Sequence, residues 1–312
     1  MPDNHLAASP KAMITRGGLS HGTGKSAKNL IRIRFGMQPG LRRPDAGIAM
    51  GGADTPPLVL HHGVCGFGDF QIGRLSLAYF QGIDRALLDR GFSMINTRVH
   101  PTAGIATRAM QLKEQVLANL DRNGMSGQRV LIVAHSMGGL DARYMISKLG
   151  MADHVAALLT VTTPHRGSPY ADWIVRNVGR RLRGFRLMDF LKIDVQAAND
   201  LTTSACRRFN EEVPDSPSAK YFSISAARPR HLVPAFALHC HKIVSDAEGD
   251  NDSLVSVKSS TWGTHLGVWP ADHWHTINKR FVVELKNPTG DIAPYYVRAV
   301  EHVAVALNAG PE

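Results

Sequence analysis

Ser136 lies where an apolar run of residues, 129–134, gives way to a helix-like segment, 140–149. The residues two places before it and two places after it are small, Ala134 and Gly138. A sharp turn from strand to helix exposes the side chain at its centre and leaves no space for larger neighbours at those two places. A serine exposed in this way is typical of a nucleophile in acyl transfer. We therefore predict that Ser136 is a nucleophile; a glycine-rich turn with an incidental serine is the alternative interpretation.

A serine hydroxyl becomes a good nucleophile only beside a base that an acid orients. In sites of this kind the acid follows the serine in the chain, and the histidine comes last. Of 15 histidines, we predict His273 as the base because it lies in a loop-like segment downstream of a plausible acid; His275 is the second choice. His135 adjoins the serine, but neighbouring side chains diverge at such a turn.

The acid that would orient His273 is sought in the polar segments that precede it. Asp252 lies in a polar turn, 249–253, that leads into a strand-like run. We predict Asp252 as the acid; the alternative is that it only makes a local Asx turn. Asp272 is too close in sequence to His273 to reach its Nδ1 atom easily. The other carboxylates ranked below Asp252 are Asp246 and Asp250.

Attack on an ester carbonyl creates an oxyanion, which backbone N–H groups stabilise. One N–H comes from the residue after the nucleophile, and the other comes from the loop after an early strand. The corresponding residues are Met137 and Val64. Gly63 and Gly66 would let this loop approach the serine closely. A plain glycine turn would show the same residues and is the alternative.

Short apolar runs alternate with helix-like segments, which predicts an α/β fold with a mostly parallel sheet flanked by helices. The carboxyl ends of parallel strands share one edge of the sheet, where ligands bind. The strands that end near residues 60, 134 and 162 would bring their loops to that edge. The predicted strands are 58–60, 92–97, 129–134, 157–162 and 221–225, and the predicted helices are 83–90, 106–120 and 140–149.

Two segments carry the excess positive charge of this chain of 312 residues, whose formal net charge is +10. Residues 1–50 contain eight Lys and Arg against two acidic residues, and residues 166–192 contain seven against two. We interpret residues 1–52 as a basic, flexible arm and residues 53–312 as one α/β domain. Basic segments contact anionic membranes or nucleic acid, or are simply solvated. Because no nucleic-acid-binding motif is present, we expect no nucleic-acid partner.

The sequence shows neither a membrane-spanning segment nor a signal peptide for export. No apolar run approaches the roughly 18 residues of a spanning helix, and the first residues lack the apolar core of a signal peptide. The three cysteines are widely spaced and form neither a disulfide framework nor a metal motif. We therefore expect a protein of the cytoplasm or of the membrane periphery.

Residues 169–200 are predicted to form a helical segment. Apolar residues recur there at intervals of three or four, which gives one apolar helical face, and arginines occupy much of the rest. Such a segment would cover the acyl pocket in water and open at an anionic lipid surface, where each arginine contributes about 1 kcal/mol. An ordinary cap helix with a solvated basic face is the alternative. The apolar residues are Ile174, Val178, Leu182, Phe185 and Met188.

In this order, the motifs resemble those of the α/β-hydrolase superfamily and, more closely, those of the true bacterial triacylglycerol lipases of the Pseudomonas–Burkholderia type. The likeness covers about residues 56–300. It implies Ser136, Asp252 and His273 as the catalytic triad, in agreement with the choice made from the residues. It also implies that the helical segment 169–200 is a lid or cap. The matching segments are 62–67 (the oxyanion loop), 134–139 (the turn at the serine), 163–168 and 208–214 (the flanks of the lid), 251–260 (the acid loop) and 272–278 (the histidine loop).

The resemblance also raises the question of a structural calcium ion, which members of this family often bind through an aspartate two residues after the catalytic histidine. His275 stands at that place here, and Lys279 stands where the next polar ligand is expected. Calcium prefers oxygen ligands, and a lysine ammonium would repel it. We therefore expect neither calcium nor any other cofactor.

Together these features predict a serine hydrolase that cleaves carboxylic esters, with lipase or esterase activity on acylglycerols through an acyl-enzyme at Ser136. A polyester depolymerase or an acyltransferase would use the same three side chains, since pocket shape and acceptor decide between them. A hydrolase fold without activity that serves only for binding is a further alternative. The intact set of serine, aspartate and histidine argues against that last interpretation.

Overall fold

The structure is a computed structural model that describes part of the chain. The described residues are 55–64, 70–72, 75–77, 79–178, 195–279 and 290–309. The predicted basic arm, residues 1–52, lies outside them.

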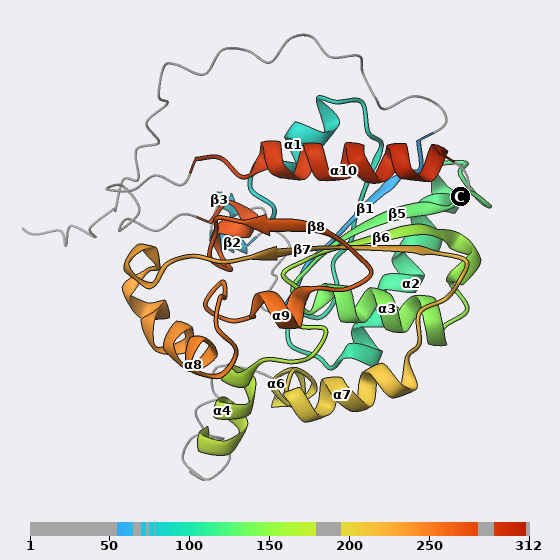
Figure 1. Ribbon diagram of the computed structural model, residues 1–312. Coiled ribbons are helices and arrows are strands. Elements are labelled where there is room, and N and C mark those ends of the chain that lie inside the picture. Colours follow the sequence, from blue (N-terminus) through green and yellow to red (C-terminus); the bar gives the residue numbers. More distant parts are fainter. Residues whose placement is uncertain are drawn as a thin grey trace, which may run out of the picture. The chain divides into compact units, whose positions relative to one another are not determined.

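Six parallel strands form one sheet in the order β4-β1-β5-β6-β7-β8 (Figure 1). The strands β1, β5 and β6 are buried along their whole length, which explains their unbroken apolar sequences. The predicted α/β fold with a mostly parallel sheet is therefore confirmed. The strands are β1 (Leu58–His61), β4 (Met94–Asn96), β5 (Val130–His135), β6 (Val155–Val161), β7 (Lys220–Ala226) and β8 (Thr264–Trp269), and a separate antiparallel pair joins β2 (Phe70–Ile72) to β3 (Leu75–Leu77).

Helices cover both faces of the sheet (Figure 1). On one face lie α1 (Ile83–Leu88) and α10 (Ala293–Asn308), which contact each other and enclose one apolar core. On the other face lie α2 (Ile105–Arg122) and α3 (Gly138–Lys148), which enclose a second core. Buried residues at intervals of three or four along α2 explain why this segment forms an amphipathic helix; they are Ala109, Leu112, Val116 and Leu120.

The remaining helices lie between α3 and β6, between β6 and β7, between β7 and β8, and after β8. The helices α4 (Pro169–Val178) and α6 (Val195–Asp200) contact each other and belong to the predicted lid, 169–200. Residues 179–194, between them, lie outside the described residues, so the lid stays a prediction. The others are α7 (Thr203–Glu212), α8 (Leu238–Glu248), α9 (Val257–Ser260) and the short 3₁₀ helices η1 (Ala152–His154), η2 (Arg230–Leu232), η3 (Ala235–Ala237) and η4 (His275–Ile277).

The predicted strands and helices all occur, with ends displaced by at most two residues. Several later elements were not predicted. The edge strand β8 is only partly buried and has no alternating apolar pattern, so its sequence carries little strand signal. By contrast, α10 buries Tyr296, Val300 and Val303 on one face, a helical spacing that was present in the sequence.

Among the described helices, none has the length and apolarity needed to cross a bilayer.

Candidate active site

Ser136 stands at the turn between β5 and α3, with a backbone angle φ of 55°. This left-handed conformation is strained for a serine. A Cβ atom at Gly138 would lie 2.8 Å from the backbone oxygen of His62, and one at Gly63 would lie 2.7 Å from the Cβ atom of Ser136. Both places therefore require glycine, and the loop after β1 is packed directly against the serine.

The structure brings the three predicted side chains into one hydrogen-bonded row. His273 Nε2 lies 3.0 Å from Ser136 Oγ, and His273 Nδ1 lies 2.6 Å from Asp252 Oδ2. Asp252 is fully buried, whereas Ser136 and His273 keep 8% and 7% of their surfaces exposed. The row is thus closed to water at its carboxylate and accessible at its hydroxyl.

The acid loop holds Asp252 in place through its own backbone. The N–H groups of Leu254 and Val255 donate to Asp252 Oδ1 at 2.9 and 2.7 Å, which leaves Oδ2 for His273. The aspartate therefore makes both the local turn and the contact with the histidine. Ser253 has a φ of 91°, a conformation that favours glycine, so the loop is strained beside the acid.

The other candidate residues do not join this row. His275 is fully buried, and its Nε2 atom donates to the carbonyl oxygen of Gly290 at 3.1 Å. Asp272 forms a buried ion pair with Arg228, with Asp272 Oδ2 and Arg228 Nη1 2.6 Å apart. The remaining two are Asp246, which pairs with Lys242 on the surface of α8, and the exposed Asp250.

The two residues predicted to supply oxyanion donors flank the serine. Met137 follows Ser136 at the N-cap of α3, and Val64 lines the same cavity as the serine. Within the described part of the chain, no hydrogen bond occupies the backbone N–H of either residue. Their role as oxyanion donors stays a prediction.

A cavity of about 430 Å³ opens beside Ser136 and His273. Its walls are mostly apolar and come from α4, α6 and the acid and histidine loops. Ile174 on the predicted apolar face of the lid lines it, as do Leu201 and Trp274. A chamber of this character suits an acyl chain better than a charged group.

Burial keeps several histidines near the site neutral. The pKa of His62 is lowered to about 3, mainly by burial and in addition by the neighbouring His61 and Arg108. Burial also lowers the pKa of His135 and His165 well below the usual value, with nearby positive groups adding to the effect. These rings therefore act as fixed hydrogen-bonding groups at neutral pH rather than as charges.

Five polar residues around the row were not identified from the sequence. Each has a partner far along the chain, and no sequence motif predicts that contact. An isolated polar residue in an apolar stretch was the one available signal, since a buried polar group needs a partner. They are Tyr79, Arg108, Asp141, Arg228 and Thr276.

The residues beside His273 do not fit a calcium ion. The ring of His275 donates to a backbone carbonyl, and the guanidinium of Arg228 already lies on the carboxylate of Asp272. A cation would be repelled there, and its oxygen ligands are lacking. Among the described residues, no group of three His, Cys, Asp or Glu side chains could hold a metal ion.

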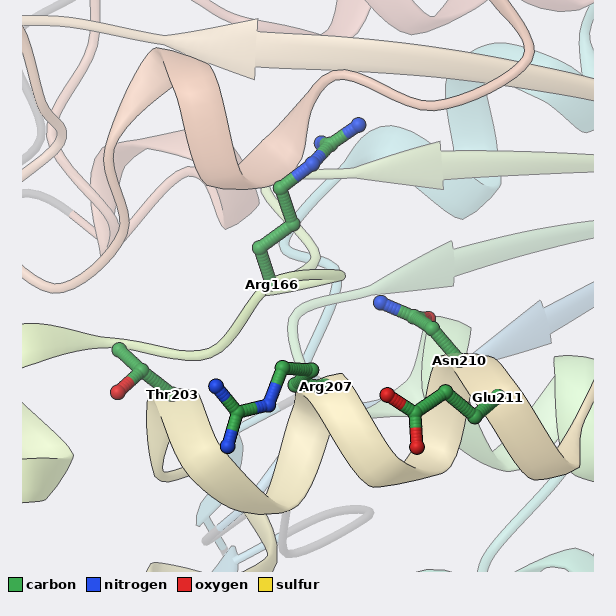
Figure 2. A pocket seen from close by; sticks show the side chains of 5 residues that line it. All are labelled: Arg166, Thr203, Arg207, Asn210 and Glu211. Atoms are coloured by element: carbon green, nitrogen blue, oxygen red, sulfur yellow. The ribbon is translucent and has the colours of Figure 1, made fainter.

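A second hollow, of about 420 Å³, lies between α7 and the loop after β6. Figure 2 shows Arg166 extending away from Arg207 rather than toward it. Arg166 Nη1 donates to the carbonyls of Lys258 and Thr261 at 2.9 and 2.6 Å, and Asn210 donates to the carbonyl of His165 at 2.8 Å. These groups hold loops together and do not converge on a ligand.

Comparison with known proteins agrees with this architecture. Residues 109–206 match the family model described as a PGAP1-like alpha/beta domain. The chain is 32% identical over 209 residues to Triacylglycerol lipase 2 of Saccharomyces cerevisiae, covering 65% of this chain and 63% of that one. It is 35% identical over 116 residues to a triacylglycerol lipase of Pseudomonas fragi, covering 37% of each. The chain thus spans less than two thirds of the length of either relative.

Solved structures show the same fold. The lipase of Staphylococcus hyicus has a TM-score of 0.66 at 16% identity and covers 87% of this chain and all of that chain. The mature lipase BlEst2 of Bacillus licheniformis has a TM-score of 0.59 at 21% identity, and the match covers 75% of this chain and 92% of that chain. The chain therefore has the α/β-hydrolase fold in the arrangement found in lipases.

Proposed function

We propose that this lipase-like protein of the α/β-hydrolase fold is a serine hydrolase of carboxylic esters. The observation that carries the proposal is the row from Ser136 through His273 to Asp252, with spacings of 3.0 and 2.6 Å, at the wall of an apolar cavity. A hydroxyl, a base and an orienting acid in contact are the groups that acyl transfer to a serine requires.

The reaction proceeds in two halves. His273 Nε2 accepts the Ser136 proton as the oxygen attacks the ester carbonyl, and the N–H groups of Val64 and Met137 stabilise the oxyanion. His273 then gives the proton to the departing alcohol, which leaves an acyl-enzyme at Ser136. In the second half a water molecule attacks and gives a proton to His273, which passes it to the Ser136 oxygen as the acid is released. Asp252 keeps the ring oriented and stabilises its charged form.

The substrate class we propose is acylglycerols. The apolar lining of the cavity suits a fatty acyl chain, and the relatives in yeast and in Pseudomonas fragi are named triacylglycerol lipases. No metal or cofactor takes part in the chemistry proposed here, because the three side chains and two amides supply every proton transfer and the charge stabilisation.

A lipid surface is the partner we propose for the segment around α4, residues 169–178, from which Ile174 reaches the cavity. Arg176, on the same helix, is exposed and would lie near anionic headgroups. This would make the protein peripheral to a membrane. An Arg176→Glu variant that binds anionic vesicles as well as the parent would contradict the idea.

The mechanism is tested by Ser136→Ala, assayed on p-nitrophenyl esters of several chain lengths. We expect kcat to fall by a factor on the order of 10⁶, and labelling by a fluorophosphonate probe to disappear. Ser218→Ala, at an exposed serine, is the matched control and should keep both. Turnover retained in Ser136→Ala would refute the assignment, and a parent protein that neither turns over esters nor takes the probe would point to a binding protein.

A further inference from the structure

Two imidazoles lie side by side next to Ser136, and only one of them is in the proposed catalytic row. The ring centroids of His135 and His273 are 4.7 Å apart. Both rings line the same cavity as the serine. A second basic imidazole at this distance would compete for the proton that His273 takes from Ser136, so something in the fold must decide between them.

A chain of four hydrogen bonds runs through His135. It starts at the backbone N–H of Gly63, which donates to Tyr79 Oη at 3.1 Å, and Tyr79 Oη lies 2.7 Å from His135 Nδ1. It continues from His135 Nε2 to Thr276 Oγ1, 2.9 Å apart, and ends where Thr276 donates to the carbonyl oxygen of His273 at 2.6 Å. The chain thus joins the oxyanion loop, the turn at the serine and the histidine loop.

The two ends of this chain dictate its direction. The carbonyl of His273 can only accept, so the Thr276 hydroxyl uses its single proton there and must accept from His135 Nε2. His135 Nε2 therefore carries a proton. Because a neutral imidazole has one donor and one acceptor, His135 Nδ1 accepts from the Tyr79 hydroxyl. The oxygen of Tyr79 then accepts from the Gly63 N–H, and every bond points the same way.

The surroundings of His135 agree with a neutral ring. The ring is almost completely buried, and its pKa is lowered well below the usual value, mainly by burial and then by His273 and Lys279. Lys279, whose Nζ atom lies 5.2 Å from the centre of the Tyr79 ring, adds positive charge on that side. The groups that pack around His135 give it no carboxylate partner among the described residues.

We infer that Tyr79, His135 and Thr276 are positioning residues that hold His135 as the neutral Nε2–H tautomer, so that His273 alone serves as the base for Ser136. This inference rests on the proposed function. The lone pair of His135 Nδ1 is occupied by the Tyr79 hydroxyl, and no free lone pair faces the neighbouring ring. The same chain clamps the loop that bears Val64 to the backbone of His273, so that oxyanion donor and base keep their spacing.

The first test is spectroscopic and needs no variant. Nitrogen chemical shifts of ¹⁵N-histidine-labelled full-length protein near pH 7.5, with the His135 signals assigned by their loss in His135→Gln, report which ring nitrogen carries the proton. We expect Nε2 protonated and Nδ1 unprotonated. Protonation at Nδ1, alone or together with Nε2, would overturn the inference. This result does not depend on whether the protein hydrolyses esters.

The second test breaks the chain at either end. Tyr79→Phe and Thr276→Val each remove one hydroxyl, and we expect each to lower kcat for a short soluble ester about ten- to a hundredfold with little change in KM, because the reacting groups lose their alignment. The double variant should be hardly slower than either single one, since one break already opens the chain. Tyr295→Phe, at a half-buried tyrosine of α10, and Thr107→Val, at an exposed threonine of α2, are the matched controls and should keep the parent kcat.

The outcomes separate this inference from its premise. Losses in kcat that multiply in the double variant, or single variants that melt earlier but keep their kcat, would indicate a merely structural role and overturn the inference. Full esterase activity in Ser136→Ala would instead refute the proposed function, while the tautomer of His135 would still be measured correctly.

Discussion

The two loops that flank the serine are held by opposite charges. At the oxyanion loop a cation does the holding, because Arg108 donates to the backbone oxygens of His62 and His100, both at 2.7 Å, and pairs with Asp141 at 2.8 Å. At the histidine loop an anion does the holding, because Asp272 Oδ1 accepts from the N–H groups of residues 274 and 275 at 3.1 and 3.0 Å. Arg228 neutralises that carboxylate at 2.6 Å.

The two ion pairs also differ in how completely they are satisfied. Both oxygens of Asp272 have partners, whereas Asp141 Oδ2 is shared by His61 and Arg108. Asp141 Oδ1 has no hydrogen-bond partner within the described residues. A buried pair contributes little net stability, but removing one partner leaves a costly bare charge. Removing one partner of the ion pair should therefore cost more stability at the oxyanion loop than at the histidine loop.

The largest effect is expected from Arg108→Met, which strips the cation from the buried Asp141 and frees the carbonyl of His62. The free energy of unfolding should fall by about 3–5 kcal/mol, as measured by urea unfolding. Arg122→Met, at the exposed end of the same helix, should change it by less than about 0.5 kcal/mol. Equal values for the two variants would contradict the role assigned to Arg108.

Asp272→Asn should have a smaller effect, because the amide keeps an oxygen for the backbone N–H groups while Arg228 loses its counter-charge. We expect a loss of roughly 2–3 kcal/mol, below that of Arg108→Met, since one partner of a buried pair is removed but its hydrogen bonds are partly kept. Asp246→Asn, in an exposed pair with Lys242, should cost at most about 0.5 kcal/mol. A larger loss for Asp272→Asn than for Arg108→Met would reverse the comparison.

Acid should destabilise the oxyanion loop in particular, because that loop contains His62, whose pKa is lowered in the fold. Its pKa is about 3 in the fold against 6.5 for the ordinary value, so between these limits the unfolded chain binds the extra proton. The stability that His62 contributes is complete above pH 6.5 and is lost on acidification, by at most about 1.4 kcal/mol per pH unit. A second proton at Nε2 would displace the N–H of Val99, which donates to it at 3.2 Å.

Urea unfolding of the parent and of His62→Gln between pH 6 and 4 measures how much His62 contributes to the loss of stability in acid. The slope of stability against pH should be shallower in the variant by about that amount per unit. Identical slopes would show that His62 is not kept neutral by the fold.

Features that depend on residues close together in the sequence were predicted well, and features that depend on contacts between distant residues were predicted less well. The turn at Ser136 was readable because its requirements are local: an apolar strand, a helix and small residues at two fixed places. The choices of Asp252 and His273 remain predictions about roles, but their positions in chain order led to two side chains that the fold brings together with the serine. The weakly patterned strand β8 escaped prediction because it is half exposed at the sheet edge.

By itself, the sequence determined the parallel sheet, the strained serine turn and a short set of chemically suitable partners, because these depend on neighbours along the chain. The tertiary structure alone decided the pairing of Arg108 with Asp141, of Arg228 with Asp272, and of Tyr79 and Thr276 with the ring of His135. The physical reason is that a buried polar group must find a partner in space. Arg228 and Asp272 are 44 positions apart and His135 and Thr276 are 141 positions apart, so no local sequence pattern predicts that they pair.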